Sequence, residues 1–411
     1  MKNGRLSICY AAPGHTLVAS AGSTRNILAV AEALGEQADV TVAFRTVSDE
    51  IAAASFAVTE IERTNAVDAR RRDDVAARGL NPLSHLVYCR TLNRFAATTA
   101  HEFDLVFEKG WRLSGYLALA FGRHGVPAIL IENDARHWNE PVATLRQLAK
   151  YLAHLSAQRV AAYCSRRTPL IIAETAQLKT ALVEQRHVAA ERIEVVHLGV
   201  DHALFRPMDQ ARARAALGLS PNKILLIYVG GLDQYHDLSP MFLALCDGTI
   251  ADLEILVVGD GEYRQRYESL AQKSAAAVRF IGKIGHERIP EYVAAADACL
   301  APYHTKGFYK GEVSFSTLKI PEYMACARPV ISVPSGHIRT LIENATTGIL
   351  FDNGPREWRQ FFESFPTREK LAEMGSRAAA KVASMSWRAT ARAYYEFGSR
   401  LRDAASRPQV A

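Results

Sequence analysis

The stretch FSTLKIPEYMACARPVISVPSGHIRT, from Phe315 to Thr340, indicates the fold more clearly than any other part of the chain. It places a carboxylate, Glu322, at the entrance of a helical segment, and the short apolar strand 329–333 and a Pro-Ser-Gly turn follow. Helix and strand in this succession are typical of an α/β sheet, which binds ligands in the crevice beyond its strand ends. A carboxylate there either balances the helix dipole or accepts hydrogen bonds from a ligand hydroxyl.

The composition is that of an ordinary globular protein with more than one core. A chain of 411 residues is too long for one core of usual size, and 49% of its residues are hydrophobic. The net charge of +6 is compatible with anionic ligands or with weak attraction to an anionic membrane surface. The longest basic run, at 70–72, is followed at once by two aspartates, which favours a solvated face and gives no reason to expect nucleic-acid binding.

The compartment is indicated by the cysteines and by the lack of long apolar segments. The six cysteines are scattered without the paired spacing of a metal site or a disulfide framework. No apolar stretch approaches the roughly twenty residues that cross a bilayer, and the first apolar run is too short for a signal peptide. No Asp-x-Asp metal motif is present. We therefore expect a cytoplasmic protein without a metal or another cofactor.

Strand and helix signals alternate along the whole chain. Predicted strands of the first half cover residues 6–10, 39–44, 104–107 and 128–131, and those of the second half 193–196, 223–229, 253–259, 278–282 and 298–301. A Pro-Gly loop is predicted after the first strand. The alternation predicts parallel, doubly wound sheets, and its restart at Ile193 predicts two Rossmann-like domains. We expect the first to cover 1–188, with a return helix in 386–411, and the second to cover 189–385.

Several short motifs follow one another in an order that resembles a known family. They are AGST at 21–24, ERIEVVHLGVD at 191–201 with FRP at 205–207, VGGLD at 229–233, VGDG at 258–261, FIG at 280–282 and the segment around Glu322. Together they resemble the retaining glycosyltransferases of family four. The resemblance implies the α/β GT-B fold, in which two Rossmann-like domains with facing parallel sheets enclose a deep cleft. It also implies an acceptor site on the N-terminal domain and a nucleotide-sugar site on the C-terminal one.

The resemblance assigns donor contacts to two glycines. Gly22 follows the first strand of the chain, and Gly230 follows the first long strand of the second domain. Without a Cβ, each would let the backbone approach a donor phosphate, and the helix N-terminus after Gly22 would favour the anion. A tight turn without any ligand explains either glycine as well.

Further donor contacts are implied around the Glu322 helix. Glu322 would accept hydrogen bonds from both ribose hydroxyls, and the backbone of Ile284 would contact the base. The distal phosphate would be held by Ser316 and Thr317 and by the amides of Thr317 and Leu318.

The sequence departs from the family where an Arg and a Lys usually neutralise the pyrophosphate. Gly231 and His236 stand at those positions, so the positive charge that a departing diphosphate needs must come from elsewhere. Lys319, three residues before Glu322, is our candidate, although a surface lysine at a helix start would look the same. His236 would add a hydrogen bond, or a charge if a phosphate raises its pKa.

Two catalytic positions also differ from the family pattern. The family's first glutamate, which touches the sugar, falls at Ser314, so either Glu312 replaces it through a shifted loop or sugar recognition is unusual. A family histidine beside the reacting carbon falls at Asn133, which would orient sugar hydroxyls or cap a loop. Asp134 or His137 could then take a proton. In retaining enzymes of this fold, however, the leaving phosphate itself is thought to accept the acceptor proton.

We therefore expect a metal-independent, retaining hexosyltransferase with a UDP- or GDP-sugar donor. Its expected acceptor is a small molecule with a hydroxyl or thiol group, in bacterial secondary-metabolite biosynthesis. One alternative is polysaccharide or lipid-linked sugar assembly at a membrane face, which the net positive charge and a weak membrane-surface association would suit. The others are a non-catalytic nucleotide-sugar-binding protein and a nucleotide-sugar epimerase on the same fold. The sequence does not indicate an oligomeric state.

Overall fold

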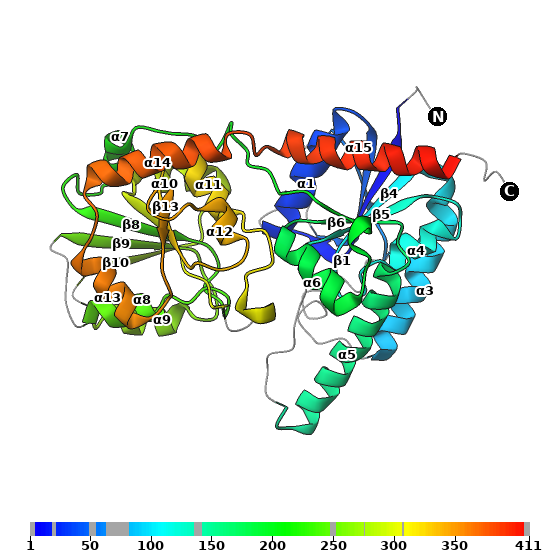
Figure 1. Cartoon of the computed structure of the whole chain (residues 1–411), viewed down its shortest axis with the longest axis horizontal. Helices are drawn as coiled ribbons and strands as arrows, with labels where there is room; N and C mark the ends of the chain where they lie inside the picture. The colour runs from blue at the N-terminus through cyan, green and yellow to red at the C-terminus, as the bar shows by residue number, and fades with distance from the viewer. Residues whose placement is uncertain are drawn as a thin grey trace. The chain divides into compact units, whose positions relative to one another are not determined.

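The computed structural model describes residues 5–18, 22–48, 55–62, 82–134, 142–246, 252–274, 276–305 and 308–406. Close contacts divide the chain into two compact units. Unit 1 is Met1–Leu198 with Trp387–Ala411, and unit 2 is Gly199–Ser386. Each unit contains a parallel sheet with helices on both of its faces (Figure 1). The prediction of two Rossmann-like α/β domains is confirmed.

The sheet of unit 1 has seven strands in the order β3-β2-β1-β4-β5-β6-β7. They are β1 (Ser7–Leu17), β2 (Asp39–Val47), β3 (Ala57–Glu60), β4 (Leu105–Lys109), β5 (Ala128–Glu132), β6 (Leu170–Ala173) and β7 (Ile193–Val195). The register aligns Ile8 with Val40 on one side and with Leu105 on the other. The residues of β4 and β5 are buried throughout, because helices cover both faces of these strands.

The two faces of this sheet carry separate apolar cores. Ile8 belongs to the core under α1 (Gly22–Gly35) and α15 (Trp387–Ser406), whereas Cys9 belongs to the core under α3 (Pro82–Thr99) and α4 (Tyr116–Gly122). The remaining helical segments of the unit are η2 (Ala100–Glu102), α5 (Leu145–Ser165), α6 (Ala176–Arg186) and η3 (Ala190–Arg192).

The C-terminal helix α15 belongs to unit 1, although it follows unit 2 in the sequence. Its residues Ala391 and Tyr394 are fully buried in the first core. A Cβ added at Gly398 would lie 2.3 Å from the side chain of Leu105, so the helix approaches β4 closely only because this position is a glycine.

The sheet of unit 2 has six strands in the order β10-β9-β8-β11-β12-β13. They are β8 (Ile224–Val229), β9 (Leu253–Val258), β10 (Ala277–Gly282), β11 (Ala298–Ala301), β12 (Val330–Ser332) and β13 (Gly348–Leu350). Its helical segments are α7 (Gln210–Ala216), α8 (Ser239–Cys246), α9 (Arg264–Ala271), η4 (His286–Arg288), α10 (Ile289–Ala295), η6 (Tyr309–Gly311), α11 (Lys319–Ala325), α12 (Ile338–Leu341), α13 (Pro355–Glu363) and α14 (Arg368–Val382). Among the helices that the structure describes in either unit, none combines the length and apolarity needed to cross a membrane.

The predicted Pro-Gly loop after the first strand is wrong. β1 continues through this segment to Leu17, and a register shift between Ala12 and Thr16 accommodates it. The carbonyl of Pro13 accepts a hydrogen bond from the hydroxyl of Tyr88 at 2.5 Å. This distant partner on α3 holds the segment extended, whereas local sequence alone favours a turn.

The predicted assignment of the strand at Ile193 to the second domain is also wrong. β7 pairs in parallel with β6 and forms an edge of the unit 1 sheet. The chain therefore passes into unit 2 after Leu198, not after residue 188. The pattern of apolar residues identifies a strand, but hydrogen bonds to a neighbour decide which sheet contains it.

Candidate functional site

Three loops meet at the carboxyl ends of β8, β9 and β10 in unit 2. The amide of Gly230 donates to the carbonyl of Val258 at 2.9 Å, and the amide of Gly259 donates to the carbonyl of Gly282 at 2.8 Å. Gly230 and Gly259 have φ values of 150° and 135°, which side chains disfavour. A Cβ at Gly259 would lie 1.9 Å from the carbonyl oxygen of Gly230. Contact between loop backbones is therefore sufficient reason for Gly259.

Lys319, the first residue of α11, reaches the Gly230 loop. Its ammonium donates a hydrogen bond to the Tyr228 hydroxyl at 3.2 Å and lies 4.4 Å from the centroid of the Tyr228 ring. The Tyr303 ring centroid is 5.8 Å away. A Cβ at Gly230 would lie 2.5 Å from this ammonium. The missing side chain of Gly230 thus makes room for the cation, in a cage of aromatic rings that favours positive charge.

The Lys319 ammonium titrates close to neutrality. Burial lowers its pKa to about 7, although the nearby carboxylates of Asp233 and Glu322 favour the charged form. An anion bound beside Nζ would stabilise the protonated ammonium. The group can therefore bind an anion, and it can exchange a proton near neutral pH.

His236 is oriented by Asp233. Its Nδ1 lies 2.9 Å from Oδ1 of Asp233, and its ring centroid is 5.0 Å from that of Tyr303. Burial, assisted by the positive charge of Lys319, lowers the pKa of His236 to about 4. The imidazole is therefore neutral near pH 7. Because a carboxylate only accepts, Nδ1 carries the proton and Nε2 is left as an acceptor.

At the neighbouring position, Gly231, the space that a side chain would take is occupied by Asp233. A Cβ at Gly231 would lie 3.0 Å from Oδ2 of Asp233, and the Gly231 carbonyl accepts a hydrogen bond from Tyr228 at 2.6 Å. A side chain at this position would require the Asp233 carboxylate to move.

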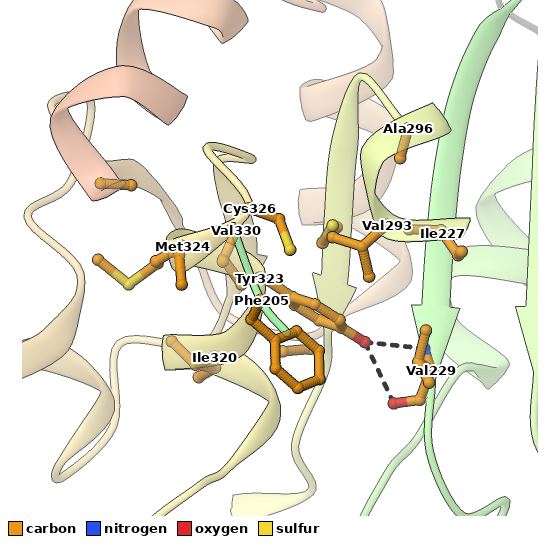
Figure 2. Packing of buried hydrophobic residues seen from close by; sticks show 14 of the residues in the cluster. Phe205, Ile227, Val229, Val293, Ala296, Ile320, Tyr323, Met324, Cys326 and Val330 are labelled. Atoms are coloured by element: carbon orange, nitrogen blue, oxygen red, sulfur yellow. Dashed lines mark hydrogen bonds between the residues drawn. The ribbon is translucent and has the colours of Figure 1, made fainter. Parts of the chain in front are cut away.

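Helix α11 is anchored to the end of β8 by Tyr323. Its hydroxyl accepts from the amide of Val229 at 2.8 Å and donates to the carbonyl of Val229 at 3.1 Å (Figure 2). Glu322 lies one residue earlier on α11 and three residues after Lys319, which places both charged side chains on neighbouring positions of one helix face. The structure thus brings Lys319 and Glu322 to the same end of the sheet as the glycine loops.

The other predicted donor residues belong to separate segments of the two units. Ser316, Thr317 and Leu318 form the turn that leads into α11, and Thr317 is buried. Ile284 is partly buried against the core beneath α11. In unit 1, Gly22 is the first residue of α1, and residues 19–21 before it lie outside the described ranges.

Glu312 is bound to another segment. Its carboxylate accepts hydrogen bonds from the amide of Gly336 and from Nη1 of Arg339, the latter at 3.0 and 3.1 Å. The Ser335 hydroxyl lies 3.4 Å from it. These contacts tie Glu312 to the turn before α12 rather than to Lys319, so a role at the sugar would require this network to open.

Asn133 of unit 1 lies beside buried charges. It follows Glu132, whose carboxylate is paired with Arg186, and Nη1 of Arg186 also donates to the Ser165 hydroxyl at 3.1 Å. A Cβ at Gly110 would lie 2.7 Å from Glu132 and 3.2 Å from the Asn133 side-chain oxygen. Asp134 follows directly, whereas His137 lies outside the described residues.

A second buried ion pair, Lys109 with Glu174, lies at the ends of β4 and β6. The motifs of the sequence do not include Lys109, Glu174 or Arg186, and they give Glu132 no role. A signal was present, since three of them are charged residues at the carboxyl ends of apolar strands, where isolated charges are costly.

Comparison with known proteins identifies relatives of both units. A family model described as Glycosyltransferase Family 4 matches residues 20–204. A second, described as Glycosyl transferases group 1, matches residues 223–364.

Curated relatives include proteins named D-inositol 3-phosphate glycosyltransferase. The one from Nocardioides sp. is 27% identical over 326 residues, which are 72% of this chain and 67% of the relative. The one from Thermomonospora curvata is 30% identical over 282 residues, which are 62% of each protein. The chain thus spans between 62% and 67% of the length of these two relatives.

Solved structures share the fold. Sucrose-phosphate synthase from Thermosynechococcus elongatus is similar with a TM-score of 0.73 and 19% identity, covering 97% of this chain and 100% of that one. HepE from Anabaena, solved in complex with UDP-glucose, is similar with a TM-score of 0.67 and 18% identity, covering 96% and 100%.

Proposed function

The chain belongs to the glycosyltransferases of family four, and we propose that it transfers a sugar from a nucleotide diphosphate sugar with retention of the anomeric configuration and without a metal ion. The observation that carries this proposal is Lys319, whose ammonium stands in an aromatic cage at the glycine loops of unit 2. Such a transfer requires a preorganised positive charge that stabilises the negative charge developing on the leaving diphosphate.

The neighbouring groups supply complementary roles in this proposal. Glu322 accepts hydrogen bonds from the ribose hydroxyls, and the turn Ser316–Leu318 presents hydroxyls and amides to the distal phosphate. His236, which is neutral and fixed by Asp233, positions the phosphate and adds little positive charge to the site. Gly230 leaves room for the Lys319 ammonium, the Gly231 loop approaches the diphosphate, and the backbone of Ile284 contacts the base.

The acceptor half of the proposal concerns unit 1. We assign Asn133 to orienting the acceptor or the sugar hydroxyls, because an amide has no basic group that could take a proton. The leaving phosphate then accepts the proton of the acceptor hydroxyl or thiol. The acceptor class to test first is small polyols and their phosphates, in view of the names of the curated relatives. UDP-sugars are the first donors to test, because UDP-glucose occupies a structural neighbour.

The direct test incubates the protein with UDP- and GDP-sugars, with and without a panel of hydroxyl and thiol acceptors, in the presence of a chelator. Nuclear magnetic resonance of the product is expected to show the donor's anomeric configuration retained. An inverted product, or transfer that stops when the chelator is added, would overturn the corresponding part of the proposal. A donor converted to its epimer in the absence of acceptor would overturn all of it.

Nucleotide binding is expected to weaken as the pH rises above about 7. The free Lys319 ammonium has a pKa of about 7, and a bound diphosphate raises that pKa, so above pH 7 binding must take up a proton. The dissociation constant should then increase by up to about tenfold per pH unit. Calorimetry with UDP or GDP in buffers of different ionisation enthalpy measures both the affinity and the proton uptake. The matched variant Lys319→Met should bind more weakly and without this pH dependence; equal pH dependence in both proteins would assign it to another group.

Replacing Glu322 with alanine is expected to lower donor affinity by about 1.5–3 kcal/mol. The loss corresponds to charge-assisted hydrogen bonds to the two ribose hydroxyls. The fold should hold, because the side chain of Glu322 is only partly buried. The comparison of UDP with its 2′-deoxy analogue separates this role from a general electrostatic one: Glu322→Ala should lose the preference for the ribose. An unchanged preference would reject the assignment.

A further inference from the structure

Helix α5 of unit 1 exposes its large apolar side chains. Leu145, Leu148 and Leu152 have 87%, 40% and 55% of their surface exposed, and their spacing places them on one face. The buried face of the same helix consists of small residues, Ala153, Ala157 and Ala161. On a surface helix the large apolar residues normally face the core and polar ones face water. This helix has the reverse arrangement.

The N-terminal half of α5 extends away from the sheet of its unit (Figure 1). No residue from Leu145 to Leu152 is buried. The helix nevertheless has a well-formed start, because the Thr144 hydroxyl accepts from the amide of Gln147 at 3.2 Å and the Gln147 side chain accepts from the Thr144 amide at 2.9 Å. The exposed leucines therefore belong to a capped helix.

The same segment is uniformly basic. From Val142 to Ala173 the chain has five Arg and Lys residues and no Asp or Glu. Arg146 and Lys150 flank the exposed leucines, and Arg159 lies further along. An exposed apolar stripe accompanied only by positive charge is typical of helices that lie in the interface of an anionic membrane.

A hollow of about 240 Å³ adjoins this helix between α4 and α5. Its lining includes the apolar side chains of Leu119, Val160 and Tyr163 together with the guanidinium groups of Arg123 and Arg159. Val160 and Tyr163 are themselves 36% and 49% exposed. Apolar walls beside two cations suit a ligand with an anionic head and an apolar tail.

We propose that α5, with the hollow beside α4, is the surface through which this protein docks on a membrane of anionic lipids. The leucines enter the interfacial layer, and the basic residues pair with lipid phosphates. Charge complementarity selects this partner, because a second copy of the chain on the same helix would bring the three basic residues of α5, Arg146, Lys150 and Arg159, against three others without any acidic residue of α5 as a partner. The inference is independent of the donor and acceptor proposed above.

The test is sedimentation of the full chain with vesicles of phosphatidylglycerol and phosphatidylcholine, compared with phosphatidylcholine alone. We expect binding to the anionic vesicles only, and release by high salt. The variant Leu145→Ser/Leu148→Ser/Leu152→Ser should reduce the partition coefficient by about tenfold or more. The variant Arg146→Gln/Lys150→Gln should reduce it by about fivefold for each basic residue removed.

Matched controls separate this surface from general effects of charge and hydrophobicity. Arg388→Gln/Arg392→Gln on α15 makes the same charge change at exposed positions of the same unit, and Leu243→Ser removes a comparably exposed leucine from unit 2. Both should bind vesicles like the unaltered protein. Thermal unfolding of every variant, followed by circular dichroism, verifies that both units remain folded.

Three results would overturn the proposal. The first is failure of the unaltered protein to sediment with anionic vesicles at low salt. The second is sedimentation of the leucine variant to the same extent as the unaltered protein. The third is a dimer, seen by light scattering without lipid, that the leucine substitutions dissociate while vesicle binding is absent. That result would make α5 an interface between copies of the chain.

Discussion

Replacing Lys319 with alanine is expected to reduce turnover by about a hundredfold at saturating donor, the scale of one lost electrostatic donor in a preorganised site. The family's Arg and Lys positions hold Gly231 and His236, and His236 is neutral near pH 7 because its pKa is about 4. We therefore expect Lys319 to be the side chain that neutralises the leaving diphosphate. Steady-state kinetics with the best donor and acceptor measure the effect.

Two matched variants make this prediction specific. Lys273→Ala removes an exposed lysine from the same unit and should leave turnover unchanged. His236→Ala should cost less than Lys319→Ala, because it removes a neutral group that Asp233 orients. Full turnover in Lys319→Ala would show that the charge comes from another residue, and Arg25 of unit 1 would be the next to test.

Replacing Arg186 with methionine is expected to lower the stability of unit 1 by about 3–5 kcal/mol. The side chains of Arg186 and Glu132 are 7% and 1% exposed, so the substitution leaves a carboxylate buried without its partner. Urea titration, monitored by hydrogen exchange of the amides in β5 and β6, measures the stability of unit 1 separately from that of unit 2. Asn133 follows Glu132 directly, so acceptor use should also suffer before the unit unfolds.

The double variant Glu132→Gln/Arg186→Met provides the control. It removes both charges, so it should be more stable than Arg186→Met alone. Arg377→Met, which breaks an exposed pair with Glu373, should cost less than about 1 kcal/mol. If Arg186→Met costs no more than Arg377→Met, the buried pair does not stabilise unit 1.

The sequence alone was sufficient for the α/β architecture of both units. Strand 224–229 is apolar on both faces, and strand 253–258 is apolar except for Glu254. A run of this kind between helical segments has few other structures available to it. The position of Lys319 three residues before Glu322 also fixes their relative placement, because both lie in one helix turn. These features depend on residues that are neighbours in the chain.

Contacts between distant residues decided the remaining features. The Tyr88 hydroxyl extends β1 through a Pro-Gly pair, and pairing with β6 assigns β7 to unit 1. Gly336 and Arg339 bind the carboxylate of Glu312, for which the sequence left a role at the sugar open.

Contacts between distant residues also decided the pairing of the buried charges and the direction in which α5 exposes its leucines. The burial that lowers the pKa of Lys319, its contact with the Tyr228 ring, and the pairing of Glu132 with Arg186 all depend on residues from separate strands and helices. The apolar and basic residues of α5 are visible in the sequence, but only the packing of its alanines shows that its leucines face outward. Composition and periodicity indicate which residues prefer a helix or a strand. Burial, charge pairing and the direction in which a helix face points depend on the other elements that pack against that helix or strand.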